Sequence, residues 1–255
     1  MKKHTLSVIL ITKNEADRIE ACLRSVVDIA DEIIVLDSGS TDDTVSICQG
    51  YTDNVTSTDW PGFGKQKQRA LDKAKCDWVL SIDADEALDK EMKHAITSLL
   101  SQDVIDETSF RLPWGVTLYG KTLKYGRSAR AVLRLFLREG AHYTLDEVHE
   151  TVIPATGTTG KLKGLLLHYT HRDYGHGLEK ATLYAWLGSQ KYYRKGKKSK
   201  GLGLALLRGF WTFFLIYFLR RGFLDGSVGF IVAMTYAQVS FNKYVGLWLI
   251  EQNRS

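Results

Sequence analysis

Residues 79–86 read Val79-Leu80-Ser81-Ile82-Asp83-Ala84-Asp85-Glu86, and this stretch decides the fold class. The residues before Asp83 are mostly apolar, which is typical of a buried strand, and carboxylates follow where that strand ends. The carboxyl ends of parallel strands form the edge of a sheet at which ligands bind. Asp83 and Asp85 should point to the same side, so they can share one hard cation that also touches a phosphate. The alternative is an acidic turn that caps a helix beginning at Leu88.

Strand and helix patterns alternate over about the first hundred residues. Apolar runs at residues 6–11 and 32–36 predict strands, and each is followed by a polar loop and a helical pattern. Further predicted elements are helices at 15–29, 45–48 and 65–74, and strands at 55–57, 110–118, 132–137 and 165–169. This alternation predicts an α/β fold with a mostly parallel sheet and helices on both faces.

Composition suits one domain with an appendage, since the chain has 255 residues and is 44% hydrophobic. We expect a domain over residues 1–175 and a helical, basic and aromatic tail over residues 176–255. The net charge of +5 indicates anionic partners such as nucleotide phosphates, nucleic acid or an acidic membrane surface. The three cysteines are far apart and form no metal-binding spacing, which favours reduced thiols in a cytosolic compartment.

The tail combines a basic run at residues 191–200 with an apolar, aromatic stretch at residues 202–219. That stretch has about the length of a membrane-spanning helix, but Arg208 interrupts it. Three interpretations stay open: a spanning helix, amphipathic helices lying in the membrane interface, and a helical cap or dimer contact. The basic run and the aromatic cluster favour the interface.

Polar residues at other strand ends can contribute to one ligand site. Asp37 ends the second predicted strand and can accept hydrogen bonds from a base or a ribose hydroxyl, although the loop after it is also a typical turn. Lys65, Lys67 and Arg69 can neutralise a diphosphate or lie on a solvated helix face. No GxGxxG loop follows a strand, and the GxxxxGK[ST] pattern at residues 115–122 overlaps the strand predicted at 110–118 instead of following a strand, which argues against P-loop and dinucleotide-binding folds.

Three motifs together resemble family 2 glycosyltransferases of the GT-A fold: residues 7–15 (SVILITKNE), residues 33–42 (IIVLDSGSTD) and residues 83–85 (DAD). This resemblance covers about the first 170 residues and implies a Rossmann-like GT-A sheet. More narrowly, Val148-His149-Glu150, His168-Tyr169 and the tail segment RRGFLDG resemble lipopolysaccharide inner-core β-1,4-glucosyltransferases. Those enzymes transfer glucose from UDP-glucose to a core heptose at the cytoplasmic face of the bacterial inner membrane.

The resemblance implies roles for particular residues. Asp37 would hold the uracil or ribose, while Asp83 and Asp85 would position Mg²⁺ or Mn²⁺ on the diphosphate. His168 would complete the metal ligands or contact phosphate, although a lone histidine is often structural. The implied nucleotide-sugar-binding residues are Thr12, Asn14, Glu15, Asp37, Ser38, Lys65, Arg69, Asp83 and Ala84.

An inverting transfer also needs a general base that takes a proton from the acceptor hydroxyl. Glu150, beside His149, is the favoured candidate, and Glu147 is the second; Asp146 and Glu147 are alternatively surface charges. A QxxRW motif is absent from the sequence, which argues against a processive polysaccharide synthase.

These implications predict a metal-dependent, inverting transferase that is peripheral on the inner face of the bacterial inner membrane. Its expected partners are a UDP-sugar, a lipid-linked saccharide acceptor and the anionic membrane surface, with no nucleic acid. Alternatives are a transferase for an exopolysaccharide lipid intermediate or a protein, and an inert UDP-sugar-binding scaffold. No residue spacing distinguishes glucose from other donor sugars.

Overall fold

The computed structural model describes residues 2–126, 131–144 and 150–252 of the chain. It divides into two compact units. The first consists of residues Met1–Gly115 and Arg130–Tyr169, and the second consists of residues Val116–Ala129 and Thr170–Ser255. The predicted division between residues 175 and 176 stays a prediction.

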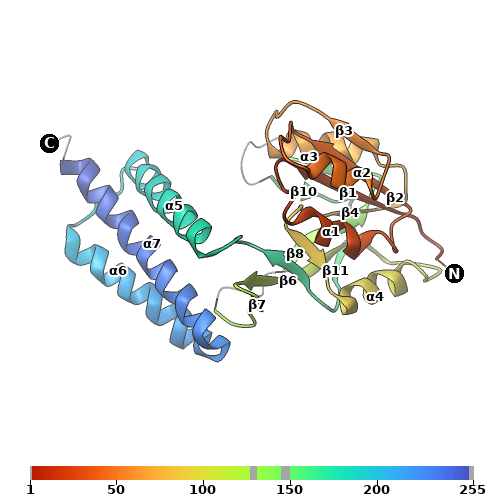
Figure 1. Cartoon of the computed structure of the whole chain (residues 1–255). Coiled ribbons are helices and arrows are strands. Elements are labelled where there is room, and N and C mark those ends of the chain that lie inside the picture. Colours follow the sequence, from red (N-terminus) through yellow and green to blue (C-terminus); the bar gives the residue numbers. More distant parts are fainter. Residues whose placement is uncertain (1, 127–130, 145–149, 253–255) are drawn as a thin grey trace. The chain divides into compact units, whose positions relative to one another are not determined.

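The first unit is an α/β sandwich (Figure 1). Its helices are α1 (Ile19–Val26), α2 (Thr44–Gln49), α3 (Phe63–Lys73) and α4 (Lys90–Leu99). The strands that begin in it are β1 (Leu6–Thr12), β2 (Glu32–Asp37), β3 (Val55–Ser57), β4 (Trp78–Ser81), β5 (Glu86–Leu88), β6 (Glu107–Leu118), β8 (Ala131–Leu137), β9 (His142–Tyr143), β10 (Val152–Ile153), β11 (Thr158–Lys161) and β12 (Leu166–Tyr169).

The sheet follows the order β3-β2-β1-β4-β8-β6-β12-β5 among the described residues. β1, β2, β3 and β4 pair in parallel, so their carboxyl ends meet at one edge. β8 pairs antiparallel with β4 and β6, and β12 pairs antiparallel with β5. The predicted α/β class, with a largely parallel sheet and C-terminal helices, is confirmed.

Alternating side chains of the parallel strands fill two separate cores, one on each face of the sheet. On β1, Val8 and Leu10 pack in the core that contains helices α1 and α4. Ile9 and Ile11 point to the other core, which contains Ala70 of α3. Because successive residues of a strand face opposite ways, a continuous apolar run needs helices on both faces.

The segment after the acidic residues differs from the sequence prediction. Residues Glu86–Leu88 form β5, and the helix predicted to begin at Leu88 begins at Lys90. Asp89 caps that helix, since its Oδ1 accepts a hydrogen bond from the backbone N–H of Met92 at 2.7 Å. The carboxylates before Leu88 are therefore not the helix cap.

The second unit consists mainly of helices (Figure 1). Its elements are the short strand β7 (Lys121–Thr122), helices α5 (Tyr174–Arg194), α6 (Leu202–Phe214) and α7 (Gly226–Gln252), a π-helical turn (Leu215–Leu219) and a 3₁₀ turn (Gly222–Asp225). α7 packs against both α5 and α6. By length and composition, Leu202–Leu219 could cross a membrane; its mean hydropathy is 1.8 and 17% of it is buried.

Asp225 ties a loop from the middle of the chain to these helices. Its carboxylate accepts hydrogen bonds from the backbone N–H groups of Lys124 at 3.1 Å and Tyr125 at 2.9 Å. The Lys121 ammonium donates to the Asp225 carbonyl oxygen at 2.6 Å, and the Gly126 N–H donates to the Arg220 carbonyl oxygen at 2.9 Å. The RRGFLDG segment thus has a structural role within the second unit.

Candidate active site

A cavity of about 530 Å³ lies in the first unit beside the carboxyl ends of β1 and β4. This is the edge at which an open α/β sheet binds ligands. Acidic, basic and aromatic side chains share its wall. The lining residues are Ile11, Thr12, Lys13, Glu15, Trp60, Phe63, Lys67, Asp83, Ala84, Asp85, Trp114, Arg134, Glu150 and His168.

The cavity gathers part of the predicted site. The predicted residues that line it are Thr12, Glu15, Asp83, Ala84, Asp85, Glu150 and His168. The predicted residues that lie outside its lining are Asn14, Asp37, Ser38, Lys65 and Arg69. Glu147 and its neighbour Asp146 lie outside the described residues.

Asp83 is held between two cations. The Lys67 ammonium, on the buried face of α3, lies 2.9 Å from Asp83 Oδ1, and Arg134 of β8 forms an ion pair with Asp83 Oδ2. The backbone N–H of Asp83 donates to Glu86 Oε2 at 2.9 Å. Side chains from α3 and β8 therefore hold this carboxylate at the cavity wall, and Glu86 of β5 holds the backbone of the same residue.

These contacts shift the pKa values of the cluster. Burial acts to raise the pKa of Asp83, but the charges of Arg134 and Lys67 outweigh it and hold that pKa well below its ordinary value. Burial raises the pKa of Glu86, and the charge of Asp83 adds to this effect. Burial acts to lower the pKa of Lys67, but the charge of Asp83 outweighs burial and keeps that pKa above its ordinary value. Asp83 and Lys67 are therefore both charged at neutral pH.

Glu150, the favoured base, also contacts Lys67. Its Oε1 atom lies 3.0 Å from the Lys67 ammonium, and its side chain is 16% exposed. One cation thus connects the candidate base to the first carboxylate of the Asp-Ala-Asp motif. A carboxylate at the wall of a cavity is accessible to an acceptor hydroxyl, as a general base requires.

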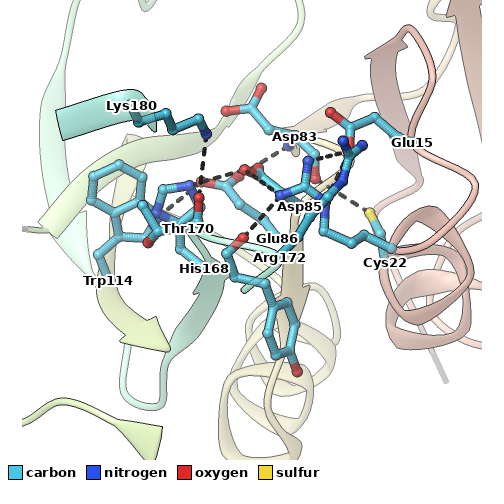
Figure 2. Close-up of polar contacts among 12 residues, drawn as sticks. Glu15, Cys22, Asp83, Asp85, Glu86, Trp114, His168, Thr170, Arg172 and Lys180 are labelled. Atoms are coloured by element: carbon cyan, nitrogen blue, oxygen red, sulfur yellow. Dashed lines mark hydrogen bonds and ion pairs between the residues drawn. The ribbon is translucent and has the colours of Figure 1, made fainter. Parts of the chain in front are cut away.

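Asp85 faces His168 (Figure 2). Asp85 Oδ2 lies 3.2 Å from His168 Nε2 and 3.7 Å from the Arg18 guanidinium. The imidazole of His168 stacks on the indole of Trp114, with centroids 4.4 Å apart and an angle of 5° between the planes. Two of the three predicted metal ligands are thus adjacent, although Asp85 lies in the turn between β4 and β5 and His168 lies on β12.

A divalent cation fits this pair when a ligand supplies further oxygens. Within the described ranges, no group of three or more His, Cys, Asp or Glu side chains is arranged to hold a metal. Mg²⁺ commonly takes only one or two carboxylates from a protein and further oxygens from substrate phosphates. Thr12 Oγ1 and Arg134 Nε, both at the cavity, are buried without a hydrogen-bond partner among the described residues. Those atoms fit a polar ligand in the cavity.

Asp37 uses its carboxylate within its own loop. Its Oδ2 atom accepts hydrogen bonds from the backbone N–H groups of Gly39 and Ser40, each at 2.9 Å, and the side chain is buried. Asn14, in a left-handed conformation with φ of 54°, accepts from the Thr41 N–H at 2.8 Å and donates its own N–H to Ser40 at 2.8 Å. Asp37 and Asn14 thus stabilise the loops that border the site.

The three other residues predicted to bind the nucleotide-sugar, Ser38, Lys65 and Arg69, do not line the cavity. Ser38 accepts a hydrogen bond from Gln66 at 3.0 Å, and Lys65 is exposed. Arg69 Nη1 lies 2.5 Å from Asp59. On α3, it is Lys67 that turns toward the acidic residues.

Sequence reasoning missed Arg134, Trp114, Trp60 and Phe63. A signal existed for Arg134, because it is the one charge within the apolar sequence Ala131–Leu137, and a charge inside a buried strand needs a partner. Trp60 and Phe63 are 44% and 43% exposed, and their rings meet edge to face with centroids 4.7 Å apart. Nothing in their spacing distinguishes them from ordinary loop residues.

Comparison with known proteins supports the family assignment. The family model Glycosyl transferase family 2 matches residues 7–149. The lipopolysaccharide core biosynthesis glycosyltransferase LpsC of Rhizobium meliloti is 32% identical over 252 residues, covering 94% of this chain and 90% of LpsC. An uncharacterized glycosyltransferase of Rickettsia bellii is 31% identical, covering 95% of this chain and 85% of that protein.

Solved structures also resemble the chain. S. aureus TarS 1–349 in complex with UDP aligns with a TM-score of 0.48 and 15% identity, covering 98% of this chain and 92% of that chain. Glucosyl-3-phosphoglycerate synthase from Mycobacterium tuberculosis aligns with a TM-score of 0.44 and 20% identity, covering 78% of this chain and 81% of that chain. The family match and the sequence relatives confirm the predicted family: this chain belongs to glycosyl transferase family 2 and is a glycosyltransferase.

Proposed function

We propose that this enzyme is a metal-dependent, inverting transferase that moves glucose from UDP-glucose to a heptose of the lipopolysaccharide inner core. The observation that supports it most is the single cavity shared by Asp83, Asp85, His168, Glu150 and Lys67. The relative LpsC, whose name refers to lipopolysaccharide core biosynthesis, matches nearly the whole chain and supports the acceptor class.

The donor diphosphate would bind at the cationic side of the cavity. Lys67 and Arg134 both lie beside Asp83, and they would compensate the charge of the phosphates. Asp85 and His168 would hold Mg²⁺ or Mn²⁺ next to the same diphosphate. When bound, the divalent cation supplies Lewis-acid stabilisation to the leaving group.

Glu150 would act on the acceptor. It takes the proton from the acceptor hydroxyl, whose oxygen forms a bond to the anomeric carbon of the donor sugar. The bond between that carbon and the diphosphate oxygen breaks, and UDP leaves with the electron pair. Attack from the side opposite UDP inverts the configuration. Lys67 lies between Glu150 and Asp83, so its ammonium would stabilise the negative charge that develops on the diphosphate as UDP leaves.

Trp60 and Phe63 would provide a surface for the acceptor sugar. Both are exposed, both line the cavity, and Phe63 lies one helical turn before Lys67 on α3. Aromatic rings present large apolar faces on which the C–H side of a sugar ring can pack. We expect Trp60→Ala to raise the KM for the acceptor several-fold while leaving the Kd for UDP within twofold of wild type. Loss of UDP affinity instead would assign Trp60 to the donor.

The second unit would keep the enzyme at the membrane that carries the acceptor. Its helices expose large apolar side chains, including Phe210 and Trp211 of α6 and Trp186 of α5. Basic residues accompany them: Lys197 and Lys243 lie over the ring of Tyr192, at 4.2 and 4.6 Å from its centroid. Apolar and cationic groups together favour peripheral binding to an anionic cytoplasmic surface. Retention there raises the effective concentration of a lipid-linked acceptor.

Membrane binding is tested by sedimentation with vesicles. The intact protein should pellet with vesicles that contain anionic phospholipid at low salt, and less with neutral phosphatidylcholine vesicles or at high salt. Protein that stays in the supernatant with anionic vesicles at low salt contradicts the proposed localisation.

The reaction is tested by measuring UDP release. The purified enzyme is given a panel of UDP-sugars with Mg²⁺, Mn²⁺ or EDTA, and lipopolysaccharide truncated after the inner-core heptose. Release that requires UDP-glucose, the metal and this acceptor supports the proposal. Release with another sugar or another acceptor would refute the core glucosyltransferase assignment.

Glu150→Gln tests the base, with Glu139→Gln as a matched control on the exposed surface. We expect Glu150→Gln to lower turnover by at least about a hundredfold, since general-base catalysis contributes about 10²–10⁴-fold. Calorimetric binding of UDP should stay intact, and Glu139→Gln should behave as wild type. Retained turnover in Glu150→Gln would move the role to Glu147 or Asp146.

A further inference from the structure

Glu86 is the third carboxylate after β4, and it is the most deeply buried acid of the site. Its side chain is fully buried and does not line the cavity. Its Oε1 atom accepts hydrogen bonds from Trp114 Nε1 at 2.9 Å and Arg134 Nη2 at 2.8 Å, and its Oε2 atom accepts from the Asp83 N–H at 2.9 Å. Both oxygens are engaged by the protein and the side chain lies off the cavity wall, so Glu86 contacts the site through Trp114, Arg134 and Asp83.

One arm of these contacts leads to His168 (Figure 2). The hydrogen bond from Trp114 to Glu86 fixes the plane of the indole, and the imidazole of His168 lies 5° from that plane with centroids 4.4 Å apart. Glu86 and His168 are also directly paired residues of the antiparallel strands β5 and β12. The His168 ring, whose Nε2 lies 3.2 Å from Asp85, is thus oriented from behind by Trp114.

The other arm leads to Asp83. Arg134 Nη2 contacts both Glu86 and Asp83, so the guanidinium is shared between a carboxylate behind the wall and a carboxylate at the wall. Glu86 also holds the backbone N–H of Asp83. Glu86 therefore restrains Asp83 directly, and it reaches Asp85 indirectly, through Trp114 and His168.

Stability alone does not explain this arrangement. Replacing a buried ion pair with packed apolar side chains is often neutral or stabilising. Groups that orient metal ligands from behind, by contrast, typically change metal affinity by about 10–100-fold when they are mutated. The contacts of Glu86 and Trp114 match that second role.

We propose that Glu86 and Trp114 are positioning residues, which hold His168 beside Asp85 in the arrangement that a divalent cation needs when it binds with the donor diphosphate. Neither residue donates an atom to the cation. Trp114 sets the plane of the imidazole, and Glu86 sets the plane of the indole. This inference rests on the metal dependence in the proposed function.

The test is the binding of UDP, measured calorimetrically with Mn²⁺ and with EDTA in the intact protein. Trp114→Phe keeps an aromatic ring to stack on His168 but removes the N–H donor, and Glu86→Gln changes the acceptor. Glu32→Gln is the matched control, because Glu32 also accepts a backbone N–H, from Lys75 at 2.6 Å, but lies at the amino end of β2. We expect the Mn²⁺-dependent gain in UDP affinity to fall about 10–100-fold in Trp114→Phe and Glu86→Gln. Affinity in EDTA should not change, and Glu32→Gln should match wild type.

A double variant separates positioning from general damage to the fold. If Trp114 acts through His168, Trp114→Phe combined with His168→Ala should bind UDP with Mn²⁺ no more weakly than His168→Ala alone. Additive losses, or a Trp114→Phe protein that keeps the full Mn²⁺ effect, would overturn the inference. Trp114→Phe decides the matter even where Glu86→Gln fails to fold. Absence of any Mn²⁺ effect in the wild type would instead refute the proposed metal dependence, and this inference with it.

Discussion

Lys67 is the cation whose removal should affect both acidic groups of the site. Its ammonium lies 2.9 Å from Asp83 and 3.0 Å from Glu150, and its side chain is 7% exposed. Lys67→Gln removes the charge while keeping a long side chain of similar helix propensity. Lys65→Gln, on the exposed side of the same helix, is the matched control.

The magnitude follows from the partners that remain. Removing one member of a buried ion pair typically costs about 3–5 kcal/mol. Asp83 keeps its ion pair with Arg134, and the side chain of Glu150 is 16% exposed, so water can solvate it. We therefore expect Lys67→Gln to lower the free energy of unfolding by about 2 kcal/mol at pH 7.5.

The difference should depend on pH in a defined direction. Burial acts to raise the pKa of Asp83, but Arg134 and Lys67 together hold it well below its ordinary value. Such a carboxylate stabilises the fold fully above its unfolded-state pKa of about 4, and this contribution is lost as pH falls toward the folded-state pKa. Without Lys67 the pKa of Asp83 should move upward. The stability difference from wild type should thus be complete at neutral pH and should narrow as pH falls through the folded-state pKa that Asp83 has without Lys67.

Urea unfolding followed by tryptophan fluorescence, in EDTA at several pH values, measures this difference. Lys65→Gln should change the free energy of unfolding by less than about 0.5 kcal/mol, as for most exposed substitutions. If Lys67→Gln were as mild as Lys65→Gln at pH 7.5, or if its destabilising effect grew as the pH was lowered, Lys67 would not hold the acidic groups as described.

Three further outcomes are expected. Burial raises the pKa of the Cys22 thiol and raises that of Cys48 to about 11, so both should resist Ellman's reagent at pH 8 until urea unfolds the protein. The partly exposed Cys76 should react slowly. Rapid reaction of all three thiols in the native protein would contradict the burial of Cys22 and Cys48. Gly229→Ala places a methyl group 2.0 Å from the backbone carbonyl oxygen of Gly222, so it should lower the free energy of unfolding by about 1–3 kcal/mol, measured by calorimetry or urea unfolding. Gly203→Ala, whose new methyl group would meet nothing within 4 Å, should be neutral or slightly stabilising. Equal effects of the two substitutions would refute the close packing of α7 at Gly229. EDTA should abolish sugar transfer and added Mn²⁺ should restore it, and full activity after removal of divalent cations would exclude the metal-dependent reaction.

The sheet could be predicted from the sequence because its strands are buried on both faces. The apolar runs that contain Val8 and Val35 have no polar side to expose, and carboxyl-end loops follow both. The same alternation predicted that Asp83 and Asp85 lie at the carboxyl edge of the parallel strands, and both line the cavity there. Parallel strands have their carboxyl ends at one edge whatever their order, so the position of these two carboxylates could be predicted before the topology was known.

The pairing of β5 with β12 was not predictable from local pattern. Residues Glu86–Leu88 are too few for a recognisable alternation, and they pair with residues some eighty positions away. Asp37 shows a second limit. The loop after it supplies N–H donors to its carboxylate, so Asp37 closes a loop, and its role in donor binding stays a prediction. Whether a carboxylate contacts loop N–H groups or a ligand depends on distances in the folded protein, and the sequence does not give those distances.

The hydrogen bonds of Asp225 also have a consequence for synthesis of the chain. The Lys124 N–H donates to the carboxylate of Asp225, which lies 101 residues later in the sequence and is therefore synthesised later. A ribosome therefore delivers every strand of the first unit, through Tyr169, well before the loop at residues 116–126 can be tied down. Domains generally fold as units, the N-terminal one first, as they emerge. The α/β unit can thus form while this loop is still free, and the loop gains its carboxylate partner only after Asp225, at the end of the 3₁₀ turn before α7, has been synthesised.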